Sequence, residues 1–171
     1  MLKALPELRS LPVGWTTGIE RPAVREIPEE KWCREDGGPR DCYAFRISGR
    51  VQYKAPGDSG SVYISLLSYP DRRVAATAFK NWSAAGKDDR AMSMPTVGDE
   101  SATVARPRAP YATASTETAV RVGTVVAHLI YQDTEKNEDH PRVLLALARM
   151  QAQRLSQAEQ GRVPDAAVTP G

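Results

Sequence analysis

The sequence predicts an α+β fold in which a single antiparallel β-sheet is packed by two main helices. Three observations support it: apolar and polar residues alternate at 47–54, and apolar residues recur with helical spacing within 71–86 and within 140–161. Strand-like runs precede each helix pattern, and one sheet with two helices on it would bury every apolar face. The 171 residues fit one domain of ordinary size.

The first half of the chain predicts a hairpin and a helix. Residues 47–54 alternate between apolar and polar side chains, as in a strand with one face exposed to solvent. Residues 55–60 are rich in turn formers. Residues 62–67 are apolar on both faces, as in a central strand. Asp71 can accept hydrogen bonds from the free amides at the start of a helix, and Gly86 can end it. One apolar stripe would pack on the sheet: Val74, Ala75, Ala78, Phe79, Trp82 and Ala85.

The next segment predicts three more strands. Residues 97–101, with the sequence Val-Gly-Asp-Glu-Ser, predict a tight turn before a strand at 102–106. Two β-prone runs follow at 116–121 and 125–131, joined by a turn at Val122-Gly123. The second of these runs is apolar nearly throughout, which favours a central position in the sheet.

The final helix is predicted from His140-Pro141, where proline is tolerated in the first turn, to Gly161. Its buried side is expected to carry Leu144, Leu147, Ala148, Leu155 and Ala158. Its wet side is expected to carry Arg149, Gln153, Gln157 and Gln160.

The domain organisation follows from these elements. Four prolines interrupt residues 1–31, which are expected to form a proline-rich N-terminal arm with Trp15 packed on the body. Residues 32–162 then form the single α+β domain, and residues 163–171 a flexible C-terminal tail.

The composition argues against several functions. The net charge is +2, and the 23 basic and 21 acidic residues are scattered, so nucleic acid is not an expected partner. No stretch approaches the ~20 apolar residues that span a bilayer. The chain also begins without a signal-peptide pattern. It is therefore expected either to act in the cytoplasm or to be a mature form from which a signal peptide or N-terminal membrane anchor was removed.

Cys33 and Cys42 are the only two cysteines, and they flank a loop rich in glycine and proline at residues 34–41. These turn formers let the ends of the loop meet, so a disulfide is the favoured interpretation, and it would contribute ~2–3 kcal/mol. The alternatives are two unrelated buried thiols or half of a metal site. Because there is no Cys-x-x-Cys and there are only two histidines, no metal and no cofactor is expected. A disulfide would imply an oxidising compartment.

Four short motifs occur in a suggestive order: Pro70-Asp71 at a helix start, Val-Gly-Asp-Glu-Ser at 97–101, Arg121-Val122-Gly123 before a hairpin return, and Gln153-Arg154-Leu155 before Gly161. This order, which spans about half of the chain, resembles the extracellular sensor and lipoprotein domains of actinobacteria, of the PknH-extracellular and LpqN-like type, whose fold is similar to PsbP. The chain departs from them in having no lipobox, no kinase domain and at most one disulfide.

The resemblance implies an exported, non-enzymatic ligand-binding or sensor-type domain, extracellular or associated with the bacterial cell envelope. Its partner would be an unknown small molecule or an envelope protein, and the resemblance supplies no catalytic residues. A concave apolar pocket between sheet and helices is the feature expected of a small-molecule sensor. The alternative is a protein-interaction or assembly module that uses a sheet edge or the arm at residues 1–31.

A hydrolase would be a third function. It would use Ser101 as the nucleophile, with His128 or His140 as the base. Asp99 would orient the base. Ser101 lacks the Gly-x-Ser-x-Gly surroundings of a nucleophile elbow. His128 lies in an apolar strand, where a histidine that either has its hydrogen bonds satisfied or faces a sheet edge is the favoured interpretation.

Oxygen-bearing side chains alternate in the loop from Gln132 to His140: Asp133, Glu135, Asn137 and Asp139. The spacing is similar to the start of a calcium loop. However, Glu138 stands where glycine is required, and Leu144 stands where the bidentate acid belongs. A charged surface loop is therefore the favoured interpretation.

Overall fold

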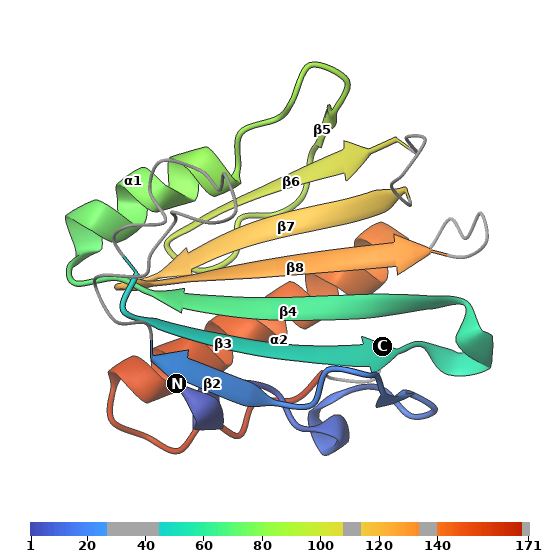
Figure 1. Ribbon diagram of the computed structural model, residues 1–171, viewed down its shortest axis with the longest axis horizontal. Helices are drawn as coiled ribbons and strands as arrows, with labels where there is room; N and C mark the ends of the chain where they lie inside the picture. Colours follow the sequence, from blue (N-terminus) through green and yellow to red (C-terminus); the bar gives the residue numbers. More distant parts are fainter. Residues whose placement is uncertain (27–44, 108–113, 134–139, 169–171) are drawn as a thin grey trace.

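A computed structural model gives the structure of the protein and describes residues 1–26, 45–107, 114–133 and 140–168. In chain order the elements are the 3₁₀ helices η1 (Leu2–Ala4) and η2 (Leu8–Ser10), strands β1 (Thr16–Thr17), β2 (Ala23–Glu26) and β3 (Ile47–Lys54), 3₁₀ helix η5 (Pro56–Asp58), β4 (Gly60–Ser68), α1 (Arg72–Trp82), β5 (Arg90–Met92), β6 (Glu100–Arg106), β7 (Ser115–Val122), β8 (Val125–Asp133) and α2 (His140–Glu159). The predicted α+β class with an antiparallel sheet is confirmed (Figure 1).

All the described strands belong to one antiparallel sheet. Its order is β1-β3-β4-β8-β7-β6-β5, and β2 also pairs with β3. β4 and β8 lie in the middle and pair along their whole length, from Gly60–Asp133 to Ser68–Val125. The central positions predicted for these two apolar strands are therefore confirmed, since both of their faces have to be buried.

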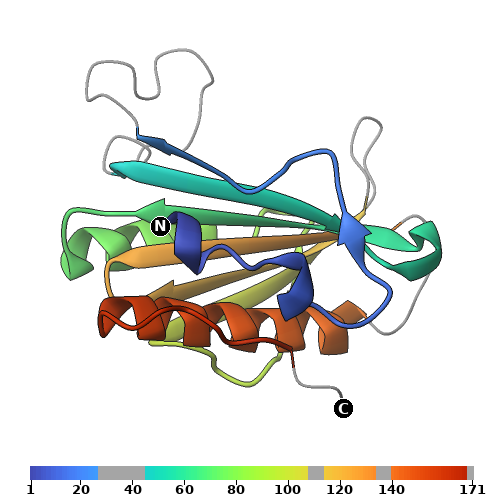
Figure 2. The same ribbon diagram turned by 90° about the horizontal axis from the view of Figure 1, so that it is seen from below.

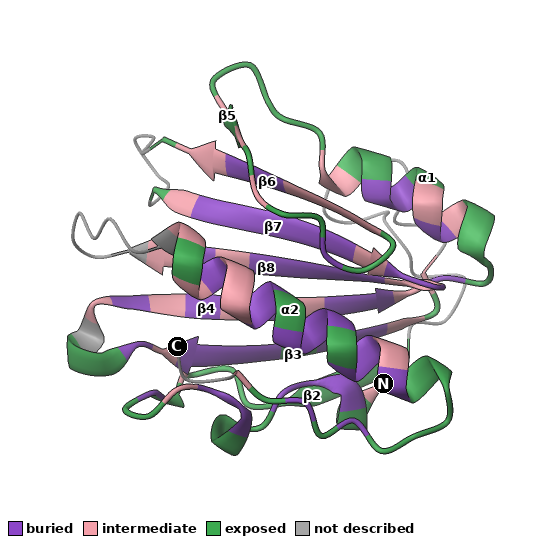
Figure 3. Ribbon diagram, turned by 180° about the vertical axis from the view of Figure 1, so that it is seen from behind, coloured by how far each residue is buried: buried purple, intermediate pink, exposed green. Residues whose placement is uncertain are grey.

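Each face of the sheet carries its own core, because successive residues of a strand point to opposite faces. The paired residues Leu66 and Ala127 lie in the core on the α2 side. Their neighbours Leu67 and Val126 lie on the other face and pack with Phe79 of α1. The two helices therefore cover opposite faces; α2 crosses behind the sheet in Figure 1 and in front of it in Figure 3.

Helix α1 begins as predicted, because the side chain of Asp71 accepts a hydrogen bond from a backbone amide in the first turn at 2.8 Å. The predicted end at Gly86 is wrong, since the helix stops at Trp82 and does not include Ala85. Gly86 instead belongs to the turn before β5. Its amide donates to the Asp89 carboxylate at 2.8 Å, and its carbonyl accepts from the Asp89 amide at 3.2 Å.

The β7–β8 turn also differs by one residue from the prediction. It consists of Gly123 and Thr124, because Val122 still pairs with Val125. Gly123 has a φ of 56°, a left-handed conformation that suits glycine at the start of a two-residue hairpin turn. β5 was not predicted at all, because a three-residue edge strand with little burial has no readable alternation.

The N-terminal arm contributes to the sheet and the core. β1 and β2 both pair with β3, although the prolines around them predicted little regular structure. Trp15 is buried, and its ring meets that of Tyr131 edge-on with centroids 6.4 Å apart, so its predicted role as an anchor is confirmed. The sequence missed the strands because their partners lie on distant segments.

The segment after α2 folds back along the helix instead of extending as a tail (Figure 2). Helix α2 ends at the predicted place, with Gly161 at a φ of 72°. Gln157, predicted to face water, is buried and binds Asp165 through both ends of its amide, at 2.6 and 3.0 Å. Ala158, predicted to be buried, is exposed. The returning segment therefore covers a side of α2 that the helical pattern of the sequence predicted to face solvent.

Two predictions fall outside the described residues. These are the disulfide between Cys33 and Cys42, and the acidic loop at residues 134–139. Both stay predictions.

Candidate functional site

A pocket of about 220 Å³ opens at the end of the sheet where α2 finishes. Seven of its ten lining residues are apolar, and the three polar ones are Ser68, Thr124 and Glu159. Three parts of the chain enclose it: the start of the N-terminal arm, the ends of four strands and the last turn of α2. The site is therefore concave and mostly apolar.

The register of the sheet builds the floor of this pocket. Ile47 pairs with Ser68, Ser68 with Val125, and Val125 with Val122, so four lining residues form one row across β3, β4, β8 and β7. Paired residues share a face of the sheet, and this row lies on the face that α2 covers. The floor could not be read from the sequence, because it joins residues from distant strands.

The last turn of α2 supplies one wall. Leu155, Ala158 and Glu159 are spaced by three and four residues, so they lie on one side of the helix. Met1 and Ala4 of the arm form the facing wall. The carbonyl groups at the end of a helix carry partial negative charge, so this wall presents a negative end to the pocket.

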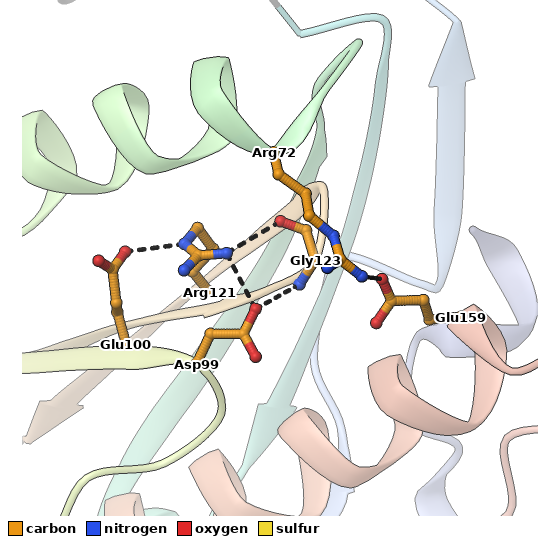
Figure 4. Close-up of polar contacts among 6 residues, drawn as sticks. All are labelled: Arg72, Asp99, Glu100, Arg121, Gly123 and Glu159. Carbon is orange, nitrogen blue, oxygen red and sulfur yellow. Dashed lines mark hydrogen bonds and ion pairs between the residues drawn. The ribbon is translucent and has the colours of Figure 1, made fainter.

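Glu159 is the one pocket-lining residue with a charged side chain. Its Oε1 accepts a hydrogen bond from Nη2 of Arg72 at 2.6 Å, and this bond raises the pKa of Arg72 (Figure 4). The pair joins the start of α1 to the end of α2 next to Gly123. Both side chains are largely in water, so the pair contributes little to stability and Glu159 can exchange its partner.

Two of the motifs found in the sequence meet beside the pocket in a hairpin network, made by Asp99, Glu100, Arg121 and Gly123 (Figure 4). Arg121 donates to Glu100 at 2.7 Å, to Asp99 at 2.9 Å and to the carbonyl of Gly123 at 3.2 Å. Asp99 also accepts from the Gly123 amide at 2.9 Å. These residues hold the β7–β8 turn in place, so the motifs serve the fold and, through it, one end of the pocket.

The residues proposed for a hydrolase are not brought together. Ser101 pairs with Val120, on the face covered by α2, and its Oγ accepts a hydrogen bond from a nearby amide at 2.9 Å. His128 lies on the opposite face, so the sheet separates the two. Asp99 belongs to the hairpin network, and the side chain of His140 is outside the described part. Ser101, His128 and Asp99 therefore do not form the triad that a hydrolase would need.

His128 instead belongs to a polar cluster that the sequence did not reveal. Its Nε2 lies 3.1 Å from Oε2 of Glu117, and its ring packs on Trp82 with centroids 5.0 Å apart. Arg106 reaches the same Oε2 at 3.1 Å, and Ser115 donates to Oε1 at 3.0 Å. Burial raises the pKa of Glu117, but His128, Arg106 and Ser115 outweigh it, so the pKa is lowered. The interpretation of His128 as a satisfied histidine is confirmed.

Among the residues that the structure describes, no group of three or more histidine, cysteine or acidic side chains is placed to hold a metal ion. In the same part of the chain, no helix combines the length and the apolar character needed to cross a membrane.

Comparison with known proteins shows a similarity of fold. No family model and no curated protein matches the chain. Among solved structures, the extracellular domain of PknH from Mycobacterium tuberculosis is similar, with a TM-score of 0.51, 10% sequence identity, and coverage of 84% of this chain and 82% of that one. At this identity the likeness concerns the fold, and the LpqN-like and PsbP-like relationships stay predictions. The chain is therefore similar in overall fold to the extracellular domain of PknH.

Proposed function

We propose that this chain is an exported, non-enzymatic sensor-type domain of the bacterial cell envelope, which binds a small amphiphilic molecule in the pocket at the end of α2. The observation that carries the proposal is the pocket itself, about 220 Å³ with mostly apolar walls. Preformed concave sites with a few convergent polar groups are where proteins bind small molecules. The fold shared with an extracellular domain supports the envelope location.

The polar groups of the pocket define the ligand further. Ser68 and Thr124 offer hydroxyl groups, and Glu159 offers a carboxylate at the negative end of α2. Such an end favours a head group that donates hydrogen bonds or carries positive charge, and it disfavours an anion. The ligand is therefore an apolar chain or ring with an ammonium or hydroxyl head group.

Three probes with the same chain and different head groups test this: octylamine, octanol and octanoate. Titration calorimetry, with methyl NMR signals of Val122 and Val125 to locate binding, should give octylamine the highest affinity and octanoate the lowest. Glu159→Gln should weaken octylamine by about fivefold, the effect of a partly exposed ion pair, and leave octanol unchanged. Glu20→Gln, at an exposed position outside the pocket and outside residues 1–11, is the matched control.

A pocket-filling variant supplies the second test. Ala158 lines the pocket and is exposed, so Ala158→Trp adds a large side chain there without breaking the core. It should abolish binding of all probes. Gln153→Trp adds the same side chain at an exposed position of the same helix that does not line the pocket, and binding should survive. The proposal fails if no probe binds the unaltered chain, or if both variants bind equally well.

Export is tested through Cys33 and Cys42. Thiol alkylation of the protein from its native host, followed by intact mass with and without prior reduction, should add label only after reduction. Labelling of both thiols in the native sample would contradict an oxidising compartment.

A second candidate function, assembly through the arm, has its own supporting observation. Five of the six exposed large apolar side chains among the described residues lie in the arm: Leu2, Leu8, Val13, Ile19 and Val24. Val13 and Ile19 are 99% and 89% exposed, which is unusual for apolar residues and typical of interaction sites when they gather in one segment. If the arm mediates self-association, sedimentation velocity should show an oligomer that Val13→Ser with Ile19→Ser disrupts. A monomer at all concentrations would contradict self-assembly.

A further inference from the structure

The start of the arm is a wall of the pocket and is also held by a separate set of contacts. Met1 and Ala4 face the pocket, while Ala4 and Leu5 are buried, at 3% and 2% exposure. Three side chains of the body hold the backbone of this segment: Tyr53, Gln151 and Arg154. We call these three residues the arm clamp.

Arg154 contributes most of the contacts. Its guanidinium donates to the carbonyl oxygens of Lys3 at 2.9 Å, Ala4 at 3.4 Å, Leu5 at 3.0 Å and Ala166 at 3.0 Å, and to Oγ of Ser10 at 3.3 Å. None of these five acceptors is a carboxylate. Burial lowers the pKa of Arg154, as expected for a cation withdrawn from water. Four of the five acceptors belong to the arm, so most of the hydrogen bonds that satisfy this charge exist only while the arm is docked; the nearby carboxylates of Glu7 and Asp165 also favour its charged form.

The other two members of the clamp also bind backbone carbonyl groups. Gln151 donates to the carbonyl of Ala4 at 3.0 Å, and the Tyr53 hydroxyl donates to that of Pro6 at 2.6 Å. Oε1 of Gln151 is fully buried and has no hydrogen-bond partner among the described residues. A buried acceptor without a partner costs free energy, so this unmet hydrogen bond weakens the docked state.

We propose that docking of the arm and occupancy of the pocket are linked, so that residues 1–11 respond to the ligand. This rests on the proposed function. A molecule in the pocket touches Met1 and Ala4 on one side and Leu155 on the other, and these contacts to the arm exist only when the arm is docked. A ligand shifts an equilibrium toward the state that it binds better. Linkage is reciprocal: if the ligand raises the equilibrium constant for arm docking by some factor, the docked arm raises the affinity of the pocket for the ligand by the same factor.

Hydrogen–deuterium exchange tests the linkage directly. The amides of Ala4, Leu5, Ser10 and Leu11 each donate to a carbonyl within the arm, so their exchange reports its state. Saturating octylamine should slow these amides by at least about fivefold, the low end of coupling between linked sites. Amides in the paired centre of β4 and β8 should not change.

Variants of the clamp test reciprocity. Arg154→Met keeps the apolar stem and removes the five contacts, so arm exchange should become faster and octylamine affinity should fall by a similar factor. Tyr53→Phe removes a single hydrogen bond and should act in the same direction if Arg154→Met does not fold. Arg149→Met, at an exposed position of the same helix, is the control and should change neither quantity.

The possible outcomes separate this inference from the proposed function. Octylamine that binds in the pocket without slowing arm exchange overturns the linkage and leaves ligand binding intact. If none of the probes binds, Ala158→Leu decides, because its side chain partly fills the pocket from within. Slower arm exchange in that variant supports the linkage, and unchanged or faster exchange overturns it.

Discussion

Replacing Gly98 by alanine tests whether the fold requires the glycine of the Val-Gly-Asp-Glu-Ser motif for its backbone conformation and its close contact with β7. Gly98 has a φ of 68°, in the left-handed region. A Cβ on it would lie 2.6 Å from the carbonyl oxygen of Arg121. That oxygen also accepts a hydrogen bond from the Asp99 amide at 2.9 Å, so moving it away would break the contact between the turn and β7. Alanine therefore meets two separate costs at this position.

Gly57 is a matched control. Its φ is 69°, and a Cβ on it would have no atom within 4 Å. Gly57→Ala should therefore lose only the cost of the left-handed conformation, ~1 kcal/mol. Gly98→Ala should lose this amount and a further ~1–3 kcal/mol for crowding, about 2–4 kcal/mol in all.

Urea unfolding followed by tryptophan fluorescence measures both losses as shifts of the midpoint at constant slope. The difference between the two variants isolates the contact with Arg121, because the conformational cost is common to both. Equal losses would refute the reasoning and would mean that the backbone at Gly98 relaxes freely.

Three further predictions concern stability. Arg121→Met should lower the free energy of unfolding by ~1–2 kcal/mol in the same urea assay, because it removes the central residue of the hairpin network. The loss stays small because the partly exposed carboxylates of Asp99 and Glu100 are hydrated in the variant. An unchanged free energy of unfolding would show that the network does not stabilise the fold. Because the folded pKa of Glu117 is lowered, its ionised form stabilises the protein above the unfolded pKa, and this contribution is lost as the pH falls below 4.5 through the folded pKa. The free energy of unfolding of Glu117→Gln should therefore fall less than that of the unaltered chain over this range, and parallel curves would contradict the assignment. Leu147→Ala, at a fully buried position, should cost ~2–5 kcal/mol, while Leu145→Ala, half-buried on the same helix, should cost clearly less.

Local patterns predicted most of the secondary structure. Strand alternation located β3, apolar runs located β4 and β8, and helical spacing located both helices. These elements are readable because burial of one or two faces imposes a period of 2.0 or 3.6 on the chain. The ends of elements were predicted less accurately. Helix α1 stops at Trp82, and Gly86 belongs to a separate turn with Asp89, a contact that helix-stop signals do not reveal.

The sequence by itself therefore determined the class of the fold, the central strands and the positions of the two main helices, because each depends on the periodicity of neighbouring residues. Only the tertiary structure decided the pocket, the cluster of Glu117 with His128, and the arm clamp. The floor of the pocket joins residues of four strands, and Arg154 binds carbonyl groups about 150 positions away in the chain. Such contacts depend on strand register and on the packing of distant segments, which the sequence does not show directly. Because every residue has a backbone carbonyl group, no sequence pattern indicates which of these groups a side chain will bind.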